Sequence, residues 1–184
     1  HHLEAFGNLM LAASNELLIA DMSAISAPHL AGQNPFSGTR LGPANFAANG
    51  TLAVASAASG FELAVVNLTD PHNPWIVTPA QFVGDGLGMV MDIHDDGEGS
   101  LWILTAGPDR IHRLDADQLP NLVILESLDL DPSGPPAALD TGRFDSENWG
   151  SDFAALFIVR RGVGLEVLDR HSLASGALDQ VPVK

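Results

Sequence analysis

The chain has 184 residues, of which 46% are hydrophobic and 17% charged, a composition typical of a globular protein and not of a disordered one. No apolar run reaches the roughly 18 residues that a transmembrane helix needs, so we expect no membrane span. The 8 basic and 23 acidic residues give a formal net charge of −15, which disfavours binding to a nucleic-acid backbone. The absence of cysteine excludes disulfides and thiolate metal sites.

The acidic excess is concentrated in the middle of the chain. Residues 1–60 carry a net charge of −2, residues 61–150 carry −13, and residues 151–184 are neutral. Such an excess attracts cations or basic partners, but it is equally typical of a solvated protein surface. From the sequence alone, the solvated surface is the favoured interpretation.

Four short apolar runs recur along the chain, beginning at residues 9, 52, 101 and 156. The periods between them are 43, 49 and 55 residues. Each run is short and is bounded by Gly, Ser, Asn or Asp, which favours strands over helices. Aligned from their first Leu, the runs occupy residues 9–13, 52–56, 101–105 and 156–160.

A second apolar run follows each of the first, after a connector that predicts a tight turn between antiparallel strands. These second runs occupy residues 17–21, 63–67, 111–115 and 165–169. The first residue is always Leu or Ile, the fourth is apolar, and the fifth is Asp or Asn. A side chain such as that of Asp21 or Asp115 can accept a hydrogen bond from a backbone N–H group two residues later, which ends the strand.

Repeats of this length predict a β-propeller, because a four-stranded antiparallel blade needs about 40–50 residues and buries its faces only against other blades. We predict one all-β domain with four blade-like units near residues 1–43, 44–86, 87–140 and 141–184. In the third unit the expected strands are 87–93, 101–105, 110–115 and 122–128. Four units fit a closed ring or part of a six- to eight-bladed ring of roughly 300–400 residues. The widening periods and abrupt start favour the partial ring, completed by further blades.

Two stretches resemble known propeller families. Residues 92–103, which read DIHDDGEGSLWI, and residues 109–115, which read DRIHRLD, are similar to one blade of the NHL and gluconolactonase-like propellers. Residues 63–74, which read LAVVNLTDPHNP, are similar to the LVIVD-type repeats of bacterial surface and secreted propellers. The resemblance implies a propeller and a periplasmic or extracellular location. It implies no single activity, because propellers with such blades serve unrelated functions.

The densest acidic stretch is a weak candidate for a calcium site, since oxygen-rich clusters suit that ion. The candidate ligands are Asp92, Asp95 and Asp96. An EF-hand loop beginning at the first of these is excluded, because His94 falls where an oxygen ligand belongs and Ile103 where a bidentate Glu belongs. The favoured alternative is a turn between two strands, with Gly97 and Gly99 at positive φ and the carboxylates in solvent.

Two further side chains and one loop are candidates for specific roles. His94 ends an expected inner strand, where a propeller's central channel lies, although a lone His on a strand is more typical of a structural residue. Trp102 occupies a strand position that predicts packing between blades. The Gly-, Asp- and Ser-rich stretch 133–151, which contains Trp149, is the best candidate for a recognition loop.

The leading functional hypothesis is a non-catalytic binding or scaffold module with a protein or small-molecule ligand at one propeller face. No nucleophile motif or zinc-protease spacing is present, and we predict no catalytic or cofactor-binding residue. The first alternative is a metal-dependent hydrolase. Its gluconolactonase-like resemblance would imply a divalent cation held by Glu, Asn and Asp from several blades. The second is a propeller fragment of a larger enzyme, whose chemistry lies in other domains.

Overall fold

The structure is a computed structural model that describes residues 2–13, 17–24, 26, 29–33, 41–47, 50–57, 63–81, 88–130, 134–144 and 153–170. These residues form fifteen β-strands and one short 3-10 helix. None of the helical structure within them is long and apolar enough to cross a membrane. The prediction of an all-β protein is therefore confirmed.

The strands form four antiparallel sheets, each made of consecutive strands. The first sheet contains β1 (His2–Phe6), β2 (Leu9–Ala13), β3 (Leu17–Asp21) and β4 (His29–Gln33). The second contains β5 (Leu41–Ala47), β6 (Leu52–Ala57), β7 (Leu63–Asn67) and β8 (Trp75–Gln81). The third contains β9 (Met89–Asp95), β10 (Ser100–Ala106), β11 (Arg110–Asp115) and β12 (Ile124–Asp129), with the 3-10 helix η1 (Ala116–Gln118) between the last two. The fourth contains β13 (Pro136–Phe144), β14 (Phe153–Arg160) and β15 (Gly164–Asp169).

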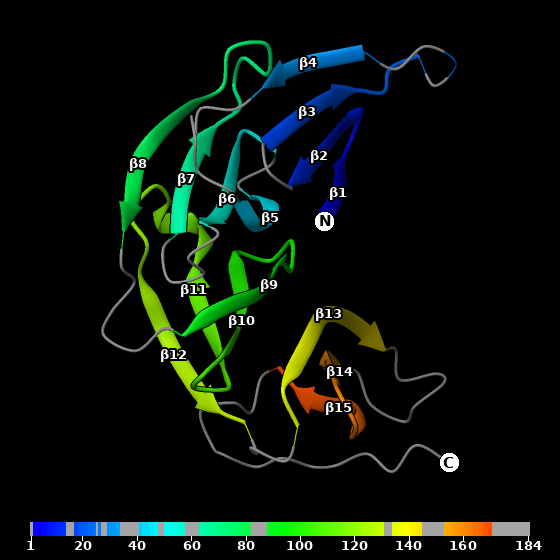
Figure 1. The fold of residues 1–184 in the computed structure, drawn as a ribbon, viewed down its shortest axis with the longest axis vertical. Helices are drawn as coiled ribbons and strands as arrows, with labels where there is room; N and C mark the ends of the chain where they lie inside the picture. Colours follow the sequence, from blue (N-terminus) through cyan, green and yellow to red (C-terminus); the bar gives the residue numbers. More distant parts are fainter. Residues whose placement is uncertain are drawn as a thin grey trace.

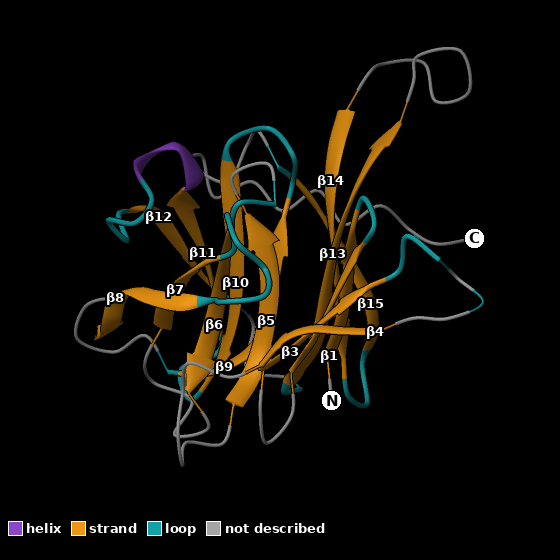
Figure 2. Ribbon diagram, turned by 90° about the horizontal axis from the view of Figure 1, so that it is seen from above, coloured by secondary structure: helices purple, strands orange, loops and turns teal. Residues whose placement is uncertain are grey.

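The four sheets stand side by side around an arc that is open on one side (Figure 1). Figure 2 shows the same sheets from above, with strands such as β5, β10 and β14 running across the thickness of the arc. The first strand of each sheet lies on the concave side, where β1 contacts β5, β5 contacts β9, and β9 contacts β13. The fourth sheet begins at Pro136, before the boundary of 141 that we expected for the fourth unit. The inner strand expected at 87–93 lies at Met89–Asp95.

The Asp or Asn that closes each of the first three second runs acts as a local turn cap. Oδ1 of Asp21 accepts a hydrogen bond from the Ser23 N–H at 2.7 Å, and Oδ1 of Asp115 accepts one from the Asp117 N–H at 3.0 Å. Asn67 accepts in the same way from the residue two positions later, at 2.8 Å. The predicted turns are confirmed at these three positions, and they end β3, β7 and β11.

Apolar layers between neighbouring sheets form the core. The layers include Ile19 and Val66 between the first two sheets, Val54 and Ile103 between the second and third, and Trp102 and Leu156 between the third and fourth. All six side chains are fully buried. Burying a large apolar side chain contributes about 1.5–3 kcal/mol to stability. The predicted packing of Trp102 between sheets is confirmed.

The alignment of the first apolar runs was one residue out of register between units two and three. Each residue that opens a second run pairs with a residue of the first run. The pairs are Leu17 with Ala13, Leu63 with Ser56, Ile111 with Leu104, and Leu165 with Val159. These partners stand fifth in the first two runs and fourth in the last two. A shift of one residue turns a side chain to the other face of a sheet. Consequently Ala53 packs toward the preceding sheet, whereas Trp102 packs toward the following one.

A pair of tryptophan variants tests the inter-sheet core. We expect Trp102→Ala to lower the free energy of unfolding by about 3–5 kcal/mol, because it leaves a cavity between two sheets. Trp75 begins β8 and is 54% exposed, so Trp75→Ala should cost less than about 1 kcal/mol. Urea unfolding measures both values. Equal losses in the two variants would contradict the packing described here.

Candidate functional site

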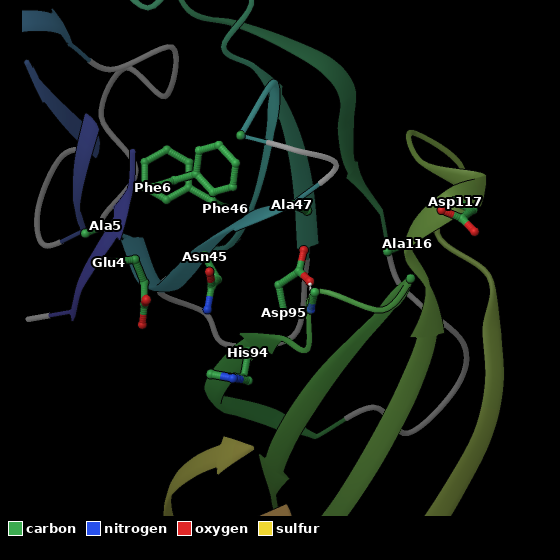
Figure 3. Close-up of a pocket in the computed structure, with 13 residues that line it drawn as sticks. Glu4, Ala5, Phe6, Asn45, Phe46, Ala47, His94, Asp95, Ala116 and Asp117 are labelled. Carbon is green, nitrogen blue, oxygen red and sulfur yellow. Dashed lines mark hydrogen bonds between the residues drawn. The ribbon is translucent and has the colours of Figure 1, made fainter. Parts of the chain in front are cut away.

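A pocket of about 360 Å³ lies on the concave side of the arc, between the inner strands of the first three sheets (Figure 3). Its polar lining consists of Glu4, Asn45, His94, Asp95 and Asp117. These residues come from β1, β5, β9 and η1. The position on the concave side corresponds to the central channel, where the sequence placed only His94.

An aromatic pair forms one wall of the pocket. The ring centroids of Phe6 and Phe46 are 6.0 Å apart, with the planes inclined at 42°. Phe46 is buried, whereas Phe6 is 44% exposed and presents part of its ring to the pocket. Gly50 has φ +75°, and a Cβ there would lie 2.2 Å from the Phe6 ring. The Phe6 ring can therefore occupy this position only with glycine at position 50.

Hydrogen bonds between inner strands fix the polar side of the pocket. Asn45 is buried and its Nδ2 donates to the Ile93 carbonyl oxygen at 3.0 Å, which joins β5 to β9. Nε2 of His94 lies 2.8 Å from the Thr141 hydroxyl and 3.5 Å from a carboxylate oxygen of Asp140, both on β13. The inner strands of three sheets are thus tied together at the pocket.

Asp95 is the perturbed acid of the site. Burial raises the pKa of its carboxyl group above the usual Asp value, and the negative charge of Asp96 adds to the increase. A hydrogen bond from the Gly97 N–H to Oδ1, at 2.7 Å, and the nearby His94 act in the opposite direction. Ionisation of Asp95 therefore lowers the stability of the folded state. Perturbed pKa values of this kind are typical of functional sites.

The pocket is lined mainly by acidic side chains among its charged groups. Glu4, Asp95 and Asp117 contribute three carboxyl groups to the lining, and no Lys or Arg is among the lining residues that the structure describes. In a partly desolvated pocket the attraction for a cation exceeds that at an open surface. The arrangement is suited to a cationic ligand that also contacts an aromatic face.

Asp92 is a tie between the third and fourth sheets. The residue is 8% exposed, and its Oδ2 accepts a hydrogen bond from the Leu139 N–H on β13 at 2.8 Å. Oδ1 accepts from the Ile93 N–H at 3.0 Å. The carboxylate that the sequence offered as a metal ligand thus holds the inner strand of the neighbouring sheet.

Asp96 has a similar structural position at the turn between β9 and β10. Its carboxylate accepts from the Ser100 N–H at 3.1 Å and from the Trp102 indole Nε1–H at 3.0 Å, and it lies 3.2 Å from the Arg170 guanidinium. The side chain is only 3% exposed, so the expectation of a solvated carboxylate was wrong here. The reason is Arg170, which reaches the turn from the end of the fourth sheet and also pairs with Glu98.

The remaining predictions for this stretch have separate outcomes. The turn itself is confirmed, with Gly97 at φ +68° and Gly99 at φ +90°. Among the described residues, no three His, Asp or Glu side chains are grouped so as to hold a metal ion. Asp95 lines the pocket, while the other two candidate ligands, Asp92 and Asp96, bond to neighbouring strands and to Arg170. Trp149 lies outside the described residues.

The sequence reasoning missed most of the pocket. Glu4, Phe6 and Asn45 carried no motif, because they meet the third sheet only through the packing of distant strands. One local signal was available for Asn45, which is a polar residue within the apolar stretch Ala44–Ala47. A buried amide in such a stretch must find a hydrogen-bond partner, and here the partner is the neighbouring inner strand.

Comparisons with known proteins identify the fold. No protein family model matches the chain, and no curated protein matches its sequence. Among solved structures, the β-propeller domain of Cps50 (Swd1) from Myceliophteria thermophila matches with a TM-score of 0.53 and 13% identity over 89% of this chain and 56% of that one. A putative 6-phosphogluconolactonase from Bacteroides uniformis matches with a TM-score of 0.58 and 11% identity over 91% and 55% of the two chains. A chain of a nidogen/laminin complex matches with a TM-score of 0.55 and 15% identity over 93% and 57%.

The chain has the β-propeller fold. The predicted architecture is confirmed, and the four sheets are its blades. Identities this low show the fold alone, so the more specific likeness to NHL and LVIVD-type blades has no support from a family model. The chain spans little more than half the length of these similar chains, 55% of one and 57% of another.

An asparagine variant tests the cost of ionising Asp95. The raised pKa means that the Asp95 carboxyl group binds its proton more tightly in the folded propeller than in the unfolded chain. Stability therefore falls as the pH rises through the interval between the usual and the raised pKa. Asp95→Asn keeps an acceptor for the Gly97 N–H but cannot ionise. We expect the variant to be more stable than the parent at neutral pH and equal to it at acid pH, as measured by urea unfolding across pH.

Asp70→Asn is the matched control for this experiment. Oδ1 of Asp70 also accepts from a backbone N–H two residues on, that of His72 at 3.0 Å, but Asp70 is exposed. We expect no pH-dependent gain of stability from this substitution. A gain of the same size in both variants would show that burial of Asp95 is not the cause.

A calcium titration tests the metal hypothesis. The oxygens of Asp92 and Asp96 already accept hydrogen bonds from protein N–H groups, and a metal would have to displace these donors. We expect no binding heat at millimolar Ca²⁺ in isothermal titration calorimetry. Saturable heat that disappears in Asp96→Asn would establish a calcium site at this turn.

Proposed function

We propose that this propeller is a non-catalytic binding module, and that its pocket receives a Lys or Arg side chain of a protein partner. One observation carries the proposal: the pocket combines three carboxyl groups with a partly exposed aromatic ring. The carboxyl groups belong to Glu4, Asp95 and Asp117, and the ring to Phe6.

The size of the pocket supports a side chain or a small ligand as its occupant. A volume of about 360 Å³ is at the lower end of the range for ligand pockets, roughly 300–1,000 Å³. The methylene groups of a Lys or Arg side chain would pack against Phe6, while the charged end would reach the carboxylates. A cation within about 6 Å of an aromatic ring gains about 0.5–1 kcal/mol at an exposed site and about 2 kcal/mol or more when desolvated.

The charge of the whole chain supports the same ligand chemistry. The formal net charge is −15, and residues 61–150 hold −13 of it. Such a field raises the local concentration of cationic ligands and the rate of their association, in a manner that salt reduces. The field disfavours phosphates and nucleic acids as ligands, because their charge has the same sign.

The binding role is supported over the hydrolase by the use of the acidic side chains. Asp92 and Asp96 bond to strands and to Arg170, which leaves them occupied in holding blades together. The nidogen/laminin match supports a protein as the partner, since a propeller of similar fold is present in that complex. The likeness of residues 63–74 to repeats of exported propellers supports a periplasmic or extracellular location as part of the proposal.

Two matched ligands test the proposal. Nα-acetyl-lysine methylamide and its norleucine analogue have the same four-carbon side chain, and only the lysine compound carries an ammonium group at its end. We expect millimolar binding of the lysine compound, with NMR shifts at Gly97 and Gly99, and much weaker binding of the analogue. Asp95→Asn should weaken the lysine compound about five-fold, equivalent to about 1 kcal/mol, whereas Asp70→Asn should leave its affinity unchanged.

Three outcomes would contradict the proposed function. Equal affinity for the lysine and norleucine compounds would show that charge is not recognised. Binding that does not weaken with added salt would argue against carboxylates as the recognising groups. Lactone hydrolysis that Ca²⁺ or Zn²⁺ supports and a chelator abolishes would show an enzyme instead.

A further inference from the structure

One face of the first blade is apolar and has no neighbour among the described residues. Leu3 on β1, Ala12 on β2 and Leu18 on β3 stand in one row across the sheet, since each pairs directly with the next. Paired residues in an antiparallel sheet share a face. Leu3 is 64% exposed and Leu18 is 36% exposed, and Leu30 on β4 adds a further side chain that is 54% exposed.

The fourth blade has a comparable face on the opposite end of the arc. Val159 on β14 pairs with Leu165 on β15, and Phe157 pairs with Val167 in the next row of the same face. Val159 is 45% exposed and Leu165 is 51% exposed. The other face of this blade is the buried one, where residues such as Leu156 pack on the third blade.

Both faces continue an interface that the interior blades already use. By the pairing registers, Leu165 stands where the first blade has Leu17, which is completely buried against the second blade. Leu18 stands where the second blade has Ala64, which is 1% exposed. The free face of the fourth blade is of the kind that packs on a following blade, and that of the first blade is of the kind that packs on a preceding one.

We propose that these two faces are inter-blade interfaces, and that further four-stranded blades of the same polypeptide cover them. The arc of four blades is open (Figure 1), and apolar faces of this kind are buried wherever two blades meet. The similar solved chains are longer, since the part that this chain matches makes up only 56% of one and 55% of another. The same polypeptide is therefore the occupant that the comparison favours over a second copy.

The test is made in the polypeptide encoded by the complete natural reading frame. Leu18→Glu and Leu165→Glu each place a carboxylate on one of the two faces. Leu125→Glu is the matched control, because Leu125 is 50% exposed but lies on β12, the outer strand of the interior third blade. We expect the first two variants to lower the melting temperature by roughly 5 °C or more, and the control by less than about 2 °C.

Leu18→Ala and Leu165→Ala provide the same comparison if the Glu variants do not fold, with an expected loss of roughly 3 °C each. A reading frame without further blade-like units would overturn the proposal. Losses no larger than that of Leu125→Glu would also overturn it. A parent dimer that Leu165→Glu converts to monomers in light scattering would identify a second copy as the occupant and would refute continuation within one chain.

Discussion

The packing of sheets face to face is the constraint on which the rest of this structure depends. Each sheet of the arc has apolar side chains on both faces, so an interior sheet is stable only between two neighbours. This requirement explains why a strand such as β7 carries apolar residues at successive positions, so that both of its faces are apolar. It also explains the exposed Leu18 and Leu165, which lie on the two faces where the described chain supplies no neighbour.

Polar bonds add orientation to this apolar packing. Asp96 joins the turn of the third blade to Arg170 at the end of the fourth, and Asp92 holds the first strand of that fourth blade. An ion pair in this buried position adds little net stability, whereas loss of one partner leaves an uncompensated charge that costs about 3–5 kcal/mol. Two carboxylates of the acidic stretch, those of Asp92 and Asp96, thus hold one blade on the next.

The sequence could predict features whose causes are local. The turn caps at Asp21 and Asp115 were predictable because each side chain bonds to the backbone two residues away. The first runs were misaligned because both of their faces are apolar. No polar residue shows which alternate side chains face the preceding blade and which face the following one. The pocket was missed for a different reason: Glu4 and Asn45 reach the third blade only after three sheets have packed together. Burial of Asp96 depended likewise on a distant arginine.

The strand β1 connects ring formation with the proposed binding site. Its side chains alternate, so that Leu3 faces the uncovered side of the first blade while Glu4 and Phe6 line the pocket. A blade packed on Leu3 would restrict the same backbone that positions Glu4, and it would lower the entropy lost when a ligand binds. Asp95 contributes from the opposite wall, at a cost to stability in its ionised form. The affinity of the pocket for a cation should therefore depend on closure of the ring beyond the first blade as well as on the pocket's own carboxylates.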